Sequence, residues 1–405
     1  MVSSLLLPGI ITIGAGVRDQ LPAVLTQLGI RHPLIVTDHA LMVHHVLNDV
    51  LALLTSRGIP FSVFDDVSPD PTTEHVEAIC RAFDADTFDG LVAIGGGSPM
   101  DAAKAAAIQK TYPDKALREL KTPFVVGESR VALVCLPTTA GTGSEVTRFA
   151  VITDVRSNEK MLIAGRGCVA AAALVDVELS MSQPARVTAD TGHDALTHGV
   201  EAYLSERHND HADTMAVSSV RRVLRNLPIV AKDPRNVDAR TQMMLAATHG
   251  GMAFSASSVA LVHGMSRAIG AIFHVPHGMA NAMLLDAVLR WTRPHALVRL
   301  ASLARDVGVA ERADTDEAAA DALLASIAAL VESMSVPTPR EFGIEQEKWT
   351  AAIPTMTQQA LASGSPGNNP GNPTDDDIRR LYAQAWDPKQ HGTREPVRTV
   401  KLQRQ

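Results

Sequence analysis

The second half of the chain holds acidic and imidazole side chains with the spacing of a metal site. Asp194 and His198 stand four residues apart in a predicted helix, so both side chains lie on one face. Alone, such a pair is more often a surface pair or a helix cap. His263 and His277 add imidazoles in apolar, glycine-punctuated segments, where a buried ring needs a partner. One carboxylate and three imidazoles suit Fe²⁺, Zn²⁺, Mn²⁺, Co²⁺ or Ni²⁺, so the ligand types predict a divalent metal without choosing among these.

A glycine loop in the first half has the chemistry of a phosphate site. A buried strand is predicted to run into a helix through Gly95, Gly96, Gly97 and Ser98, and Asp101 follows within that helix. Residues without a Cβ let the backbone approach a pyrophosphate, and the start of a helix favours an anion. A tight strand-to-helix turn is the alternative interpretation, because Met100 replaces the third glycine of the usual dinucleotide fingerprint.

Two further segments supply polar groups for a nucleotide. The loop 137–145 carries Thr138, Thr139 and Thr142, whose hydroxyls suit phosphate or nicotinamide binding. Asp38 ends an earlier strand, where a carboxylate could accept bonds from ribose hydroxyls and repel a 2′-phosphate. That favours NAD over NADP, although a lone aspartate is more often an ordinary turn residue. Because Asp38 precedes the glycines, the strand order must differ from that of the usual fingerprint.

The elements around these residues predict two domains. Up to Gln183, short apolar strands alternate with helices, which indicates a parallel Rossmann-like sheet covered on both faces. Nucleotides bind at the carboxyl ends of such strands. From Pro184, the chain shows helical periodicity almost without strand signals. We therefore predict an NAD-binding α/β domain over 1–183 and an all-helical, metal-binding catalytic domain over 184–405.

The apolar patterns place these elements as follows. The predicted strands include Ile10–Ile13, Pro33–Thr37, Phe61–Phe64, Gly90–Ile94 and Val131–Leu136. The predicted helices of the second domain include Arg186–Leu204, Asp213–Leu227, Ala239–Phe254, Val288–Val307 and Asp316–Met334. Near the end, Thr374 is a plausible N-cap for a further helix.

The composition argues against several functional classes. With a formal net charge of −7, the chain has no electrostatic reason to bind nucleic acid or anionic lipid. Its apolar stretches fall far short of the roughly 18 residues of a transmembrane helix, and the N-terminus lacks the basic region of a signal peptide. The three cysteines, Cys80, Cys135 and Cys168, have no metal-type spacing, and we expect Cys135 to pack in the core. We expect a cytoplasmic protein with a small-molecule substrate.

Taken together and in this order, the motifs resemble the iron-containing (group III) alcohol dehydrogenase family. The resemblance rests on four segments: Gly95–Asp101, Pro137–Glu145, Gly192–His198, and His263 together with Pro276–Gly278. It extends from about Leu7 to Trp386, almost the whole chain. It implies a dehydroquinate synthase-like architecture, with an N-terminal NAD(P)-binding α/β domain, a helical C-terminal domain, a bound metal and a homodimer.

The resemblance also implies residue roles. It makes Asp194, His198, His263 and His277 the metal ligands. It implies that the cofactor contacts are Asp38, Asp70, Gly95, Gly96, Gly97, Ser98, Asp101, Thr138, Thr139, Thr142 and Lys160, with Asp70 near the adenine. Phe149 and Phe254 resemble residues that line the substrate pocket.

One position departs from the family pattern. Many relatives carry a further histidine four residues after the third ligand, near the reacting carbon, where this chain has Arg267. A guanidinium cannot relay a proton, so His274 is the nearest substitute; alternatively His274 packs, and protons pass through water and ribose hydroxyls. Arg267 could favour a substrate with a carboxylate, such as a short ω-hydroxy acid. A structural salt bridge is the other interpretation.

These observations predict a metal-dependent, NAD-linked oxidoreductase that interconverts a small alcohol or hydroxy acid and its aldehyde or ketone. A divalent metal would lower the pKa of the alcohol, so that hydride can leave the carbinol carbon for C4 of the nicotinamide. Maleylacetate-reductase-like and polyol-dehydrogenase-like relatives are the nearest alternatives, but the former work without the metal and the latter usually have a different ligand set. A nucleotide-binding filament protein without turnover would show degenerate ligands.

Overall fold

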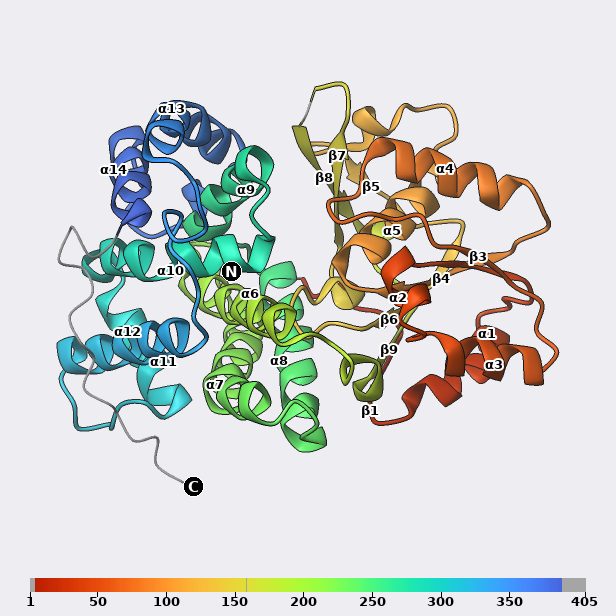
Figure 1. Ribbon diagram of the computed structural model, residues 1–405, viewed down its shortest axis with the longest axis horizontal. Coiled ribbons are helices and arrows are strands. Elements are labelled where there is room, and N and C mark those ends of the chain that lie inside the picture. The colour runs from red at the N-terminus through yellow and green to blue at the C-terminus, as the bar shows by residue number, and fades with distance from the viewer. Residues whose placement is uncertain (1–3, 158, 388–405) are drawn as a thin grey trace. The chain divides into compact units, whose positions relative to one another are not determined.

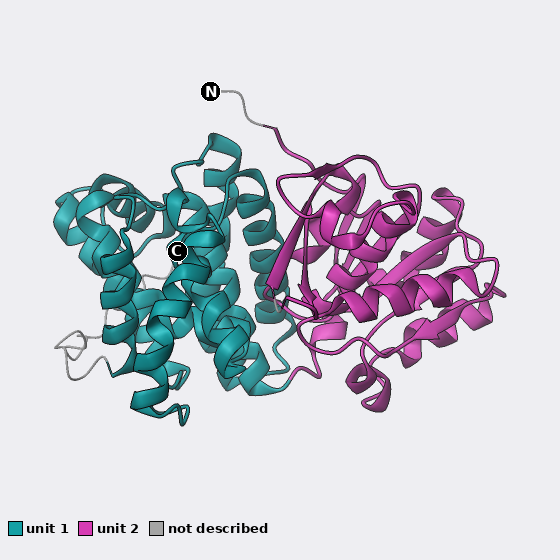
Figure 2. Cartoon of the chain, turned by 90° about the horizontal axis from the view of Figure 1, so that it is seen from above, with its two compact units in different colours: residues 1–3, 184–405 teal, residues 4–183 magenta. Residues whose placement is uncertain are grey.

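The computed structural model describes residues 4–157 and 159–387. Residues 1–3, 158 and 388–405 lie outside the described residues, and with them the predicted outer ends of the two domains. The chain forms two compact units that divide between Gln183 and Pro184 (Figure 2).

The first unit is built on a six-stranded parallel sheet, which confirms the predicted fold class (Figure 1). In spatial order the strands are β1 (Ile10–Gly14), β9 (Ala172–Asp176), β6 (Ala132–Pro137), β4 (Gly90–Gly95), β2 (Pro33–Val36) and β3 (Ser62–Phe64). The chain moves outward from β2 to β3 on one side and from β4 through β6 to β9 on the other. The order therefore reverses between β2 and β4, and ligands of open α/β sheets bind at the carboxyl ends of strands that flank such a reversal.

Both faces of the sheet are buried, because successive side chains of each strand point to opposite sides. Leu91 and Ala93 of β4 pack in one core, and Val92 and Ile94 pack in the other. The first core includes residues of α4 (Thr73–Asp84) and α5 (Gly97–Thr111), and the second includes residues of α1 (Leu21–Gln27) and α3 (Asn48–Ser56). A short helix, α2 (His39–Val43), follows β2. Cys135 lies in the first core, as expected, and burial raises the pKa of its thiol to about 12.

A second, three-stranded sheet is absent from the sequence prediction. It consists of β5 (Val125–Val126), β8 (Glu159–Gly165) and β7 (Phe149–Asp154), with β7 and β8 antiparallel. Buried residues alternate with less buried ones along β7 and β8, and the buried side includes Ala150, Ile152, Met161 and Ile163. A half-buried hairpin buries only every second residue, so its apolar signal is weaker than that of the parallel strands.

The second unit is helical, with no strand among its described residues. Its helices are α6 (Ala185–Leu204), α7 (Asp210–Lys232), α8 (Val237–Ala256), α9 (Leu261–Phe273), α10 (His277–Thr292), α11 (Leu297–Val307), α12 (Asp316–Ser333), α13 (Gln346–Ala362) and α14 (Asp375–Trp386). Pro184 is the N-cap of α6, one residue before its predicted place as first helical residue. Thr374 caps α14 as predicted, accepting a hydrogen bond from the Asp377 backbone N–H at 3.2 Å.

One predicted helix is wrong in its extent. The stretch Val288–Val307 was expected to be continuous, but α10 ends at Thr292 and α11 begins at Leu297. Pro294 lies between them, and a proline inside a helix removes one hydrogen bond and clashes with the preceding turn. The break at this proline separates α10 from α11.

Within the described residues, no single helix has both the length and the apolar composition to cross a membrane. The consecutive helices α8 and α9 reach that threshold only as a pair, and they are bent by 107° relative to one another.

Candidate metal and nucleotide sites

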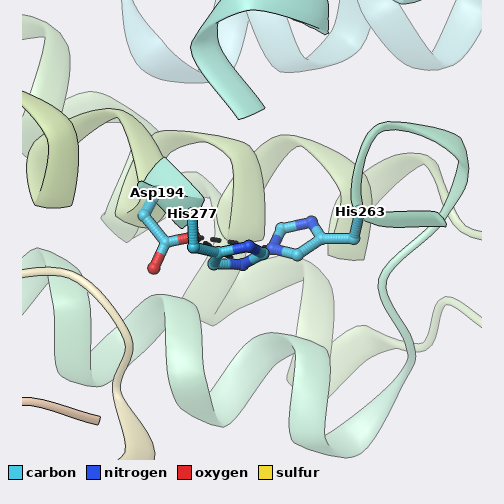
Figure 3. Close-up of side chains that lie close together, drawn as sticks. All are labelled: Asp194, His263 and His277. Carbon is cyan, nitrogen blue, oxygen red and sulfur yellow. Dashed lines mark ion pairs between the residues drawn. The ribbon is translucent and has the colours of Figure 1, made fainter. Parts of the chain in front are cut away.

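Three helices bring the predicted metal ligands together. Asp194 and His198 lie one turn apart on α6, His263 lies in the first turn of α9, and His277 begins α10. The Nε2 atoms of His198, His263 and His277 lie 3.7, 3.5 and 3.6 Å from the same oxygen, Oδ1 of Asp194. In Figure 3, the rings of His263 and His277 converge on this carboxylate from two different helices.

These separations fit shared coordination of one ion. An N–H···O hydrogen bond spans about 2.7–3.2 Å, which is shorter than the distances observed. Two ligands bonded to one ion at ~2.1 Å with a tetrahedral angle would lie about 3.4 Å apart. The ligand atoms of Asp194, His263 and His277 all lie within 4.8 Å of one another. His198 is not one of these three residues, but its Nε2 atom lies 3.7 Å from Oδ1 of Asp194. Its ring stacks on that of His263 with centroids 4.6 Å apart.

The donor chemistry of the group also fits a cation. Nδ1 of His263 lies 2.5 Å from Oε2 of Glu201, and because a carboxylate only accepts, this ring nitrogen carries the hydrogen. In the neutral ring, which is the form that binds a metal, Nε2 of His263 then turns a lone pair toward the carboxylate of Asp194, an arrangement that is repulsive without a positive group between them. The amide nitrogen of Asn281 lies 2.8 Å from Oδ1 of Asp194 and 3.3 and 3.4 Å from Nε2 of His263 and His277. An N–H donor thus faces the same atoms that a divalent cation would bind.

The group is buried except on one side. The side chains of Asp194, His198 and His263 are 3, 6 and 2% exposed, whereas that of His277 is 37% exposed. Burial alone would raise the pKa of Asp194, but the imidazoles of His198 and His277 outweigh it and hold the pKa below its ordinary value. The carboxylate is therefore ionised, and His277 is the member of the group that is partly exposed.

Two residues of this site were missed by the sequence reasoning. Glu201 follows His198 by three residues on α6, and Asn281 follows His277 by four on α10, so each lies on the same helical face as a predicted ligand. That spacing is visible in the sequence and could have identified both residues.

Arg267, which the sequence predicts near the reacting carbon, lies beside the metal group on helix α9. Arg267 lies one turn after His263 on α9, and Nη1 donates to Oγ of Ser365 at 3.4 Å. Burial lowers the pKa of the Arg267 guanidinium, and Glu201 partly offsets that effect. Among the described residues, no carboxylate lies within 4.0 Å of this guanidinium, so this part of the chain does not form the salt bridge that the sequence left open.

His274 and Phe254 also have clear positions. His274 is the C-cap of α9, in the left-handed conformation with φ 55°, and it is exposed. The alternative interpretation that His274 packs is therefore wrong, because this side chain is exposed. Phe254 stacks on His198, with ring centroids 4.3 Å apart, so this predicted pocket residue adjoins the metal group.

The predicted nucleotide loops lie side by side in the first unit. Strand β4 leads into α5 through its N-cap Gly96, and β4 pairs with β6 so that Gly95 is opposite Pro137. The backbone N–H of Thr138 donates to the carbonyl of Gly95 at 2.9 Å. A Cβ at Gly97 would lie 3.0 Å from the Thr142 methyl group, so a side chain there would require Thr142 to shift by a few tenths of an ångström. The glycine loop and the threonine loop therefore form one surface at the carboxyl ends of β4 and β6.

Two buried hydroxyls at this edge point to a ligand. Oγ1 of Thr139 and Oγ1 of Thr37 are buried and have no hydrogen-bond partner among the described residues. Thr139 follows β6 and Thr37 follows β2, so they flank the glycine loop after β4 on both sides. Buried hydroxyls are normally hydrogen-bonded, and a nucleotide bound here would supply the missing partners. Thr37 carried no distinguishing signal in the sequence.

The acidic and basic residues predicted to contact the cofactor also have structural partners. Asp38 follows β2, beside β4, and caps α2 by accepting from the Leu41 N–H at 3.0 Å. Strand order thus explains how an acid that precedes the glycines in sequence can adjoin them in space. Asp70 and Lys160 bind each other, with Nζ 2.6 Å from the carboxylate.

The carboxylate of Asp101 is bound by other residues of the protein. Its carboxylate accepts from Oγ of Ser144 at 2.6 Å, which favours a role in holding the threonine loop over direct contact with a cofactor. Lys104, which the sequence reasoning missed as a site residue, is fully buried on the same helix, and its Nζ also donates to Ser144. Phe149 begins β7 directly after this loop.

Comparisons with known proteins agree with this arrangement. The model of the iron-containing alcohol dehydrogenase family matches residues 8–177, and that of the family's C-terminal region matches residues 188–386. NADPH-dependent butanol dehydrogenase of Clostridium saccharobutylicum is 34% identical over 342 residues, which cover 83% of this chain and 86% of that protein. Lactaldehyde reductase of Escherichia coli is 33% identical over 376 residues, which cover 92% of this chain and 97% of that protein.

Solved structures share the whole fold. A 1,3-propanediol oxidoreductase superposes with a TM-score of 0.90 at 30% identity, covering 95% of this chain and 100% of that one. Sulfoacetaldehyde reductase from Bifidobacterium kashiwanohense, solved in complex with NAD⁺, superposes with a TM-score of 0.85 at 28% identity, covering 95% and 99%. With both halves matched by family models and the fold shared throughout, the chain belongs to the iron-containing alcohol dehydrogenase family.

Proposed function

We propose that the protein is a metal-dependent, NAD-linked oxidoreductase that interconverts a small alcohol or hydroxy acid and its aldehyde or ketone by hydride transfer. The observation that carries this proposal is the convergence of Asp194, His263 and His277 in one group, in which Asp194 and His263 are buried and His277 is partly exposed. When bound there, a divalent metal would supply Lewis-acid polarisation of the alcohol oxygen and lower its pKa.

The chain's own residues would divide the work. Asp194, His198, His263 and His277 would hold the metal, and the family's name favours Fe²⁺ as that metal. The stacked ring of Phe254 would shield His198 from water. Protons would leave through water and ribose hydroxyls or through His274, because a guanidinium at position 267 does not titrate near neutral pH.

The nucleotide loops would hold NAD. Backbone N–H groups at Gly96, Gly97 and Ser98 start a helix and suit a pyrophosphate. The hydroxyl of Thr139, which has no partner in the described part of the chain, suits a further polar atom of the cofactor. The butanol dehydrogenase relative is described as NADPH-dependent. We nevertheless propose NAD for this chain, because the carboxylate of Asp38 at the end of β2 would repel a 2′-phosphate.

Metal removal tests the proposed function. Protein treated with a chelator is expected to form no NADH from a panel of C2 to C6 alcohols and hydroxy acids, and added Fe²⁺ or another divalent metal is expected to restore NADH formation. Parallel assays with NADP are expected to give the lower kcat/KM. Turnover that persists in the metal-free protein would contradict the proposal and favour a maleylacetate-reductase-like enzyme, and no turnover with any metal would favour a non-catalytic nucleotide-binding protein.

Arg267 supports a narrower substrate class, alcohols that carry a carboxylate. Its guanidinium lies one turn from His263 and has only the neutral hydroxyl of Ser365 as a hydrogen-bond partner among the described residues. A divalent metal would balance the charges of Asp194 and Glu201, which leaves the cation of Arg267 without compensation. A substrate anion would supply that compensation through a charge-assisted hydrogen bond.

Changing Arg267 to Leu is expected to lower kcat/KM for 4-hydroxybutyrate relative to 1-butanol by about ten- to a hundredfold, the worth of one charge-assisted hydrogen bond. The measurement is the ratio of the two kcat/KM values in wild type and variant. Arg290→Leu is a matched control, because Arg290 pairs with Asp286 at 3.0 Å on the exposed side of α10. A ratio that Arg267→Leu leaves unchanged refutes the role in substrate selection, whereas an equal loss of NAD binding would assign the cation to the cofactor.

Other expectations remain predictions. The free state of Cys80, Cys135 and Cys168 supports the expected cytoplasmic location. The homodimer implied by the family resemblance and the absence of nucleic-acid and membrane partners also stay predictions.

A further inference from the structure

Glu201 connects the metal group to the start of helix α9. It lies on α6 and its side chain is 3% exposed. One carboxylate oxygen, Oε1, accepts from the backbone N–H of Val262 at 2.6 Å and from that of His263 at 3.3 Å. The other, Oε2, accepts from Nδ1 of His263 at 2.5 Å. One buried carboxylate thus binds both the backbone and the ring of a single predicted metal ligand.

The backbone contacts cap α9 from a neighbouring helix. The first N–H groups of a helix have no partner within the helix and are usually satisfied by the side chain of the N-cap residue. The N-cap of α9 is Ala260, which has no side chain that could do so. Glu201 supplies the acceptor instead, and its negative charge lies at the positive end of the helix dipole.

The ring contact determines which nitrogen of His263 can bind a metal. Among the described residues Glu201 has three hydrogen-bond partners, two backbone N–H groups and Nδ1 of His263, and because a carboxylate only accepts, Nδ1 must be a donor. The hydrogen of the neutral ring therefore stays on Nδ1, and the lone pair on Nε2 is directed toward Asp194, 3.5 Å away. Glu201 contacts the Nδ1 side of the ring, whereas Nε2 faces Asp194, so Glu201 holds this ligand and is not placed to be one itself.

We propose that Glu201 is a positioning residue that fixes the backbone at the start of α9 and the tautomer of His263 together, so that Nε2 is presented to the metal. This inference rests on the proposed function, because it requires a metal at the Asp194 group. Carboxylates that hold metal-binding histidines typically change metal affinity 10- to 100-fold when replaced, so the effect should be about this large.

The variant Glu201→Gln tests the proposal because glutamine has the same shape but only one acceptor oxygen. If that oxygen keeps the backbone N–H groups of α9, the amide NH₂ faces Nδ1 of His263. The ring must then carry its hydrogen on Nε2, where it blocks metal binding. If the amide is reversed, two donors oppose each other at the start of α9. Either arrangement weakens the metal site, whereas Glu201→Asp keeps two acceptors on a shorter side chain and should have an intermediate effect.

The measurement is metal affinity rather than activity. Metal-free protein is titrated with Zn²⁺ by calorimetry and with Co²⁺ by its visible absorption, which reports the coordination geometry. We expect Glu201→Gln to bind Zn²⁺ about 10- to 100-fold more weakly than wild type and to change the Co²⁺ spectrum. Thr315→Ala is the matched control: Thr315 caps α12 by accepting from the Ala318 N–H at 3.2 Å, so this variant loses a helix cap of the same unit. It should have a lower melting temperature but unchanged metal affinity.

The outcomes separate the two proposals. Wild-type protein that binds neither metal overturns the proposed function. If wild type binds these metals and Glu201→Gln has the same metal affinity and the same Co²⁺ spectrum, only the role of Glu201 is overturned. If Glu201→Gln does not fold by circular dichroism, Glu201→Asp decides: weaker binding supports the proposal, and wild-type affinity overturns it.

Discussion

Changing Asp194 to Asn is expected to abolish metal binding and to lower kcat/KM by about a thousandfold or more, because a metal ion contributes several kcal/mol of transition-state stabilisation. Oδ1 of Asp194 is the atom on which the three Nε2 atoms converge, and this carboxylate is the charged member of the predicted ligand set. Asparagine keeps the shape of the side chain but loses the charge.

The measurements are metal content by elemental analysis, turnover, and NADH binding by fluorescence. NADH binding should remain close to wild type, because the nucleotide loops belong to the other compact unit. Asp190→Asn is a matched control on the same helix: Asp190 is buried one turn earlier and forms an ion pair with Arg186 rather than with the metal group. Full metal content in Asp194→Asn, or equal metal loss in both variants, would contradict the assignment of Asp194.

Changing Lys104 to Met is expected to destabilise the protein by about 3–5 kcal/mol, the usual result of removing one partner from a buried charged pair. The ammonium group is fully buried, 4.0 Å from the carboxylate of Asp101. It donates to the backbone carbonyls of Ser144, Thr147 and Phe149 at 2.5, 3.2 and 3.0 Å. Methionine has similar length but no donor, so these oxygens would lose their partner.

The same change should weaken NAD binding. Lys104 and Asp101 both lie on the helix that begins at the glycine loop, and both hold the threonine loop through Ser144. Without Lys104, the threonine loop loses one of these two contacts to the helix that begins at the glycine loop. The measurements are denaturation by urea and the KM for NAD, with metal content as a reference that should not change.

A matched control lies on the same helix. Lys110 forms an ion pair with Asp84 at the surface, and such pairs are worth less than about 1 kcal/mol. Lys110→Met should therefore have close to wild-type stability and KM. If Lys104→Met is no less stable than Lys110→Met, the buried lysine does not anchor the loops.

Local patterns of apolar residues and glycines were sufficient to predict the main helices and strands of the fold. The buried strand that ends at Gly95 and the helix that follows it were predictable, because unbroken apolar runs and glycines are local signals. The helical character after Pro184 was predictable from its periodicity. The hairpin β7–β8 was not, since only alternate residues of each strand are buried. The break between α10 and α11 has a local signal in the sequence, Pro294, which cannot continue a helix without losing a hydrogen bond.

The polar partners of the sites were harder to predict. Lys104 looks like an ordinary helix residue in sequence, and its role depends on the path of a loop forty residues later. Thr37 is one threonine among many in the sequence. It becomes distinctive only in the structure, as a buried hydroxyl beside the glycine loop with no partner in residues 4–157 and 159–387. In each case the decisive contact joins segments that are far apart along the chain.

By itself, the sequence determined that Asp194 and His198 share a helical face and that a glycine loop joins a buried strand to a helix, because both follow from the local geometry of the chain. Only the tertiary structure decided that His263 and His277 meet the same carboxylate oxygen, that β2 lies beside β4, and that Glu201 holds the ring of His263. These contacts depend on how helices and strands pack against one another, and the periodicity of one element does not specify its neighbour.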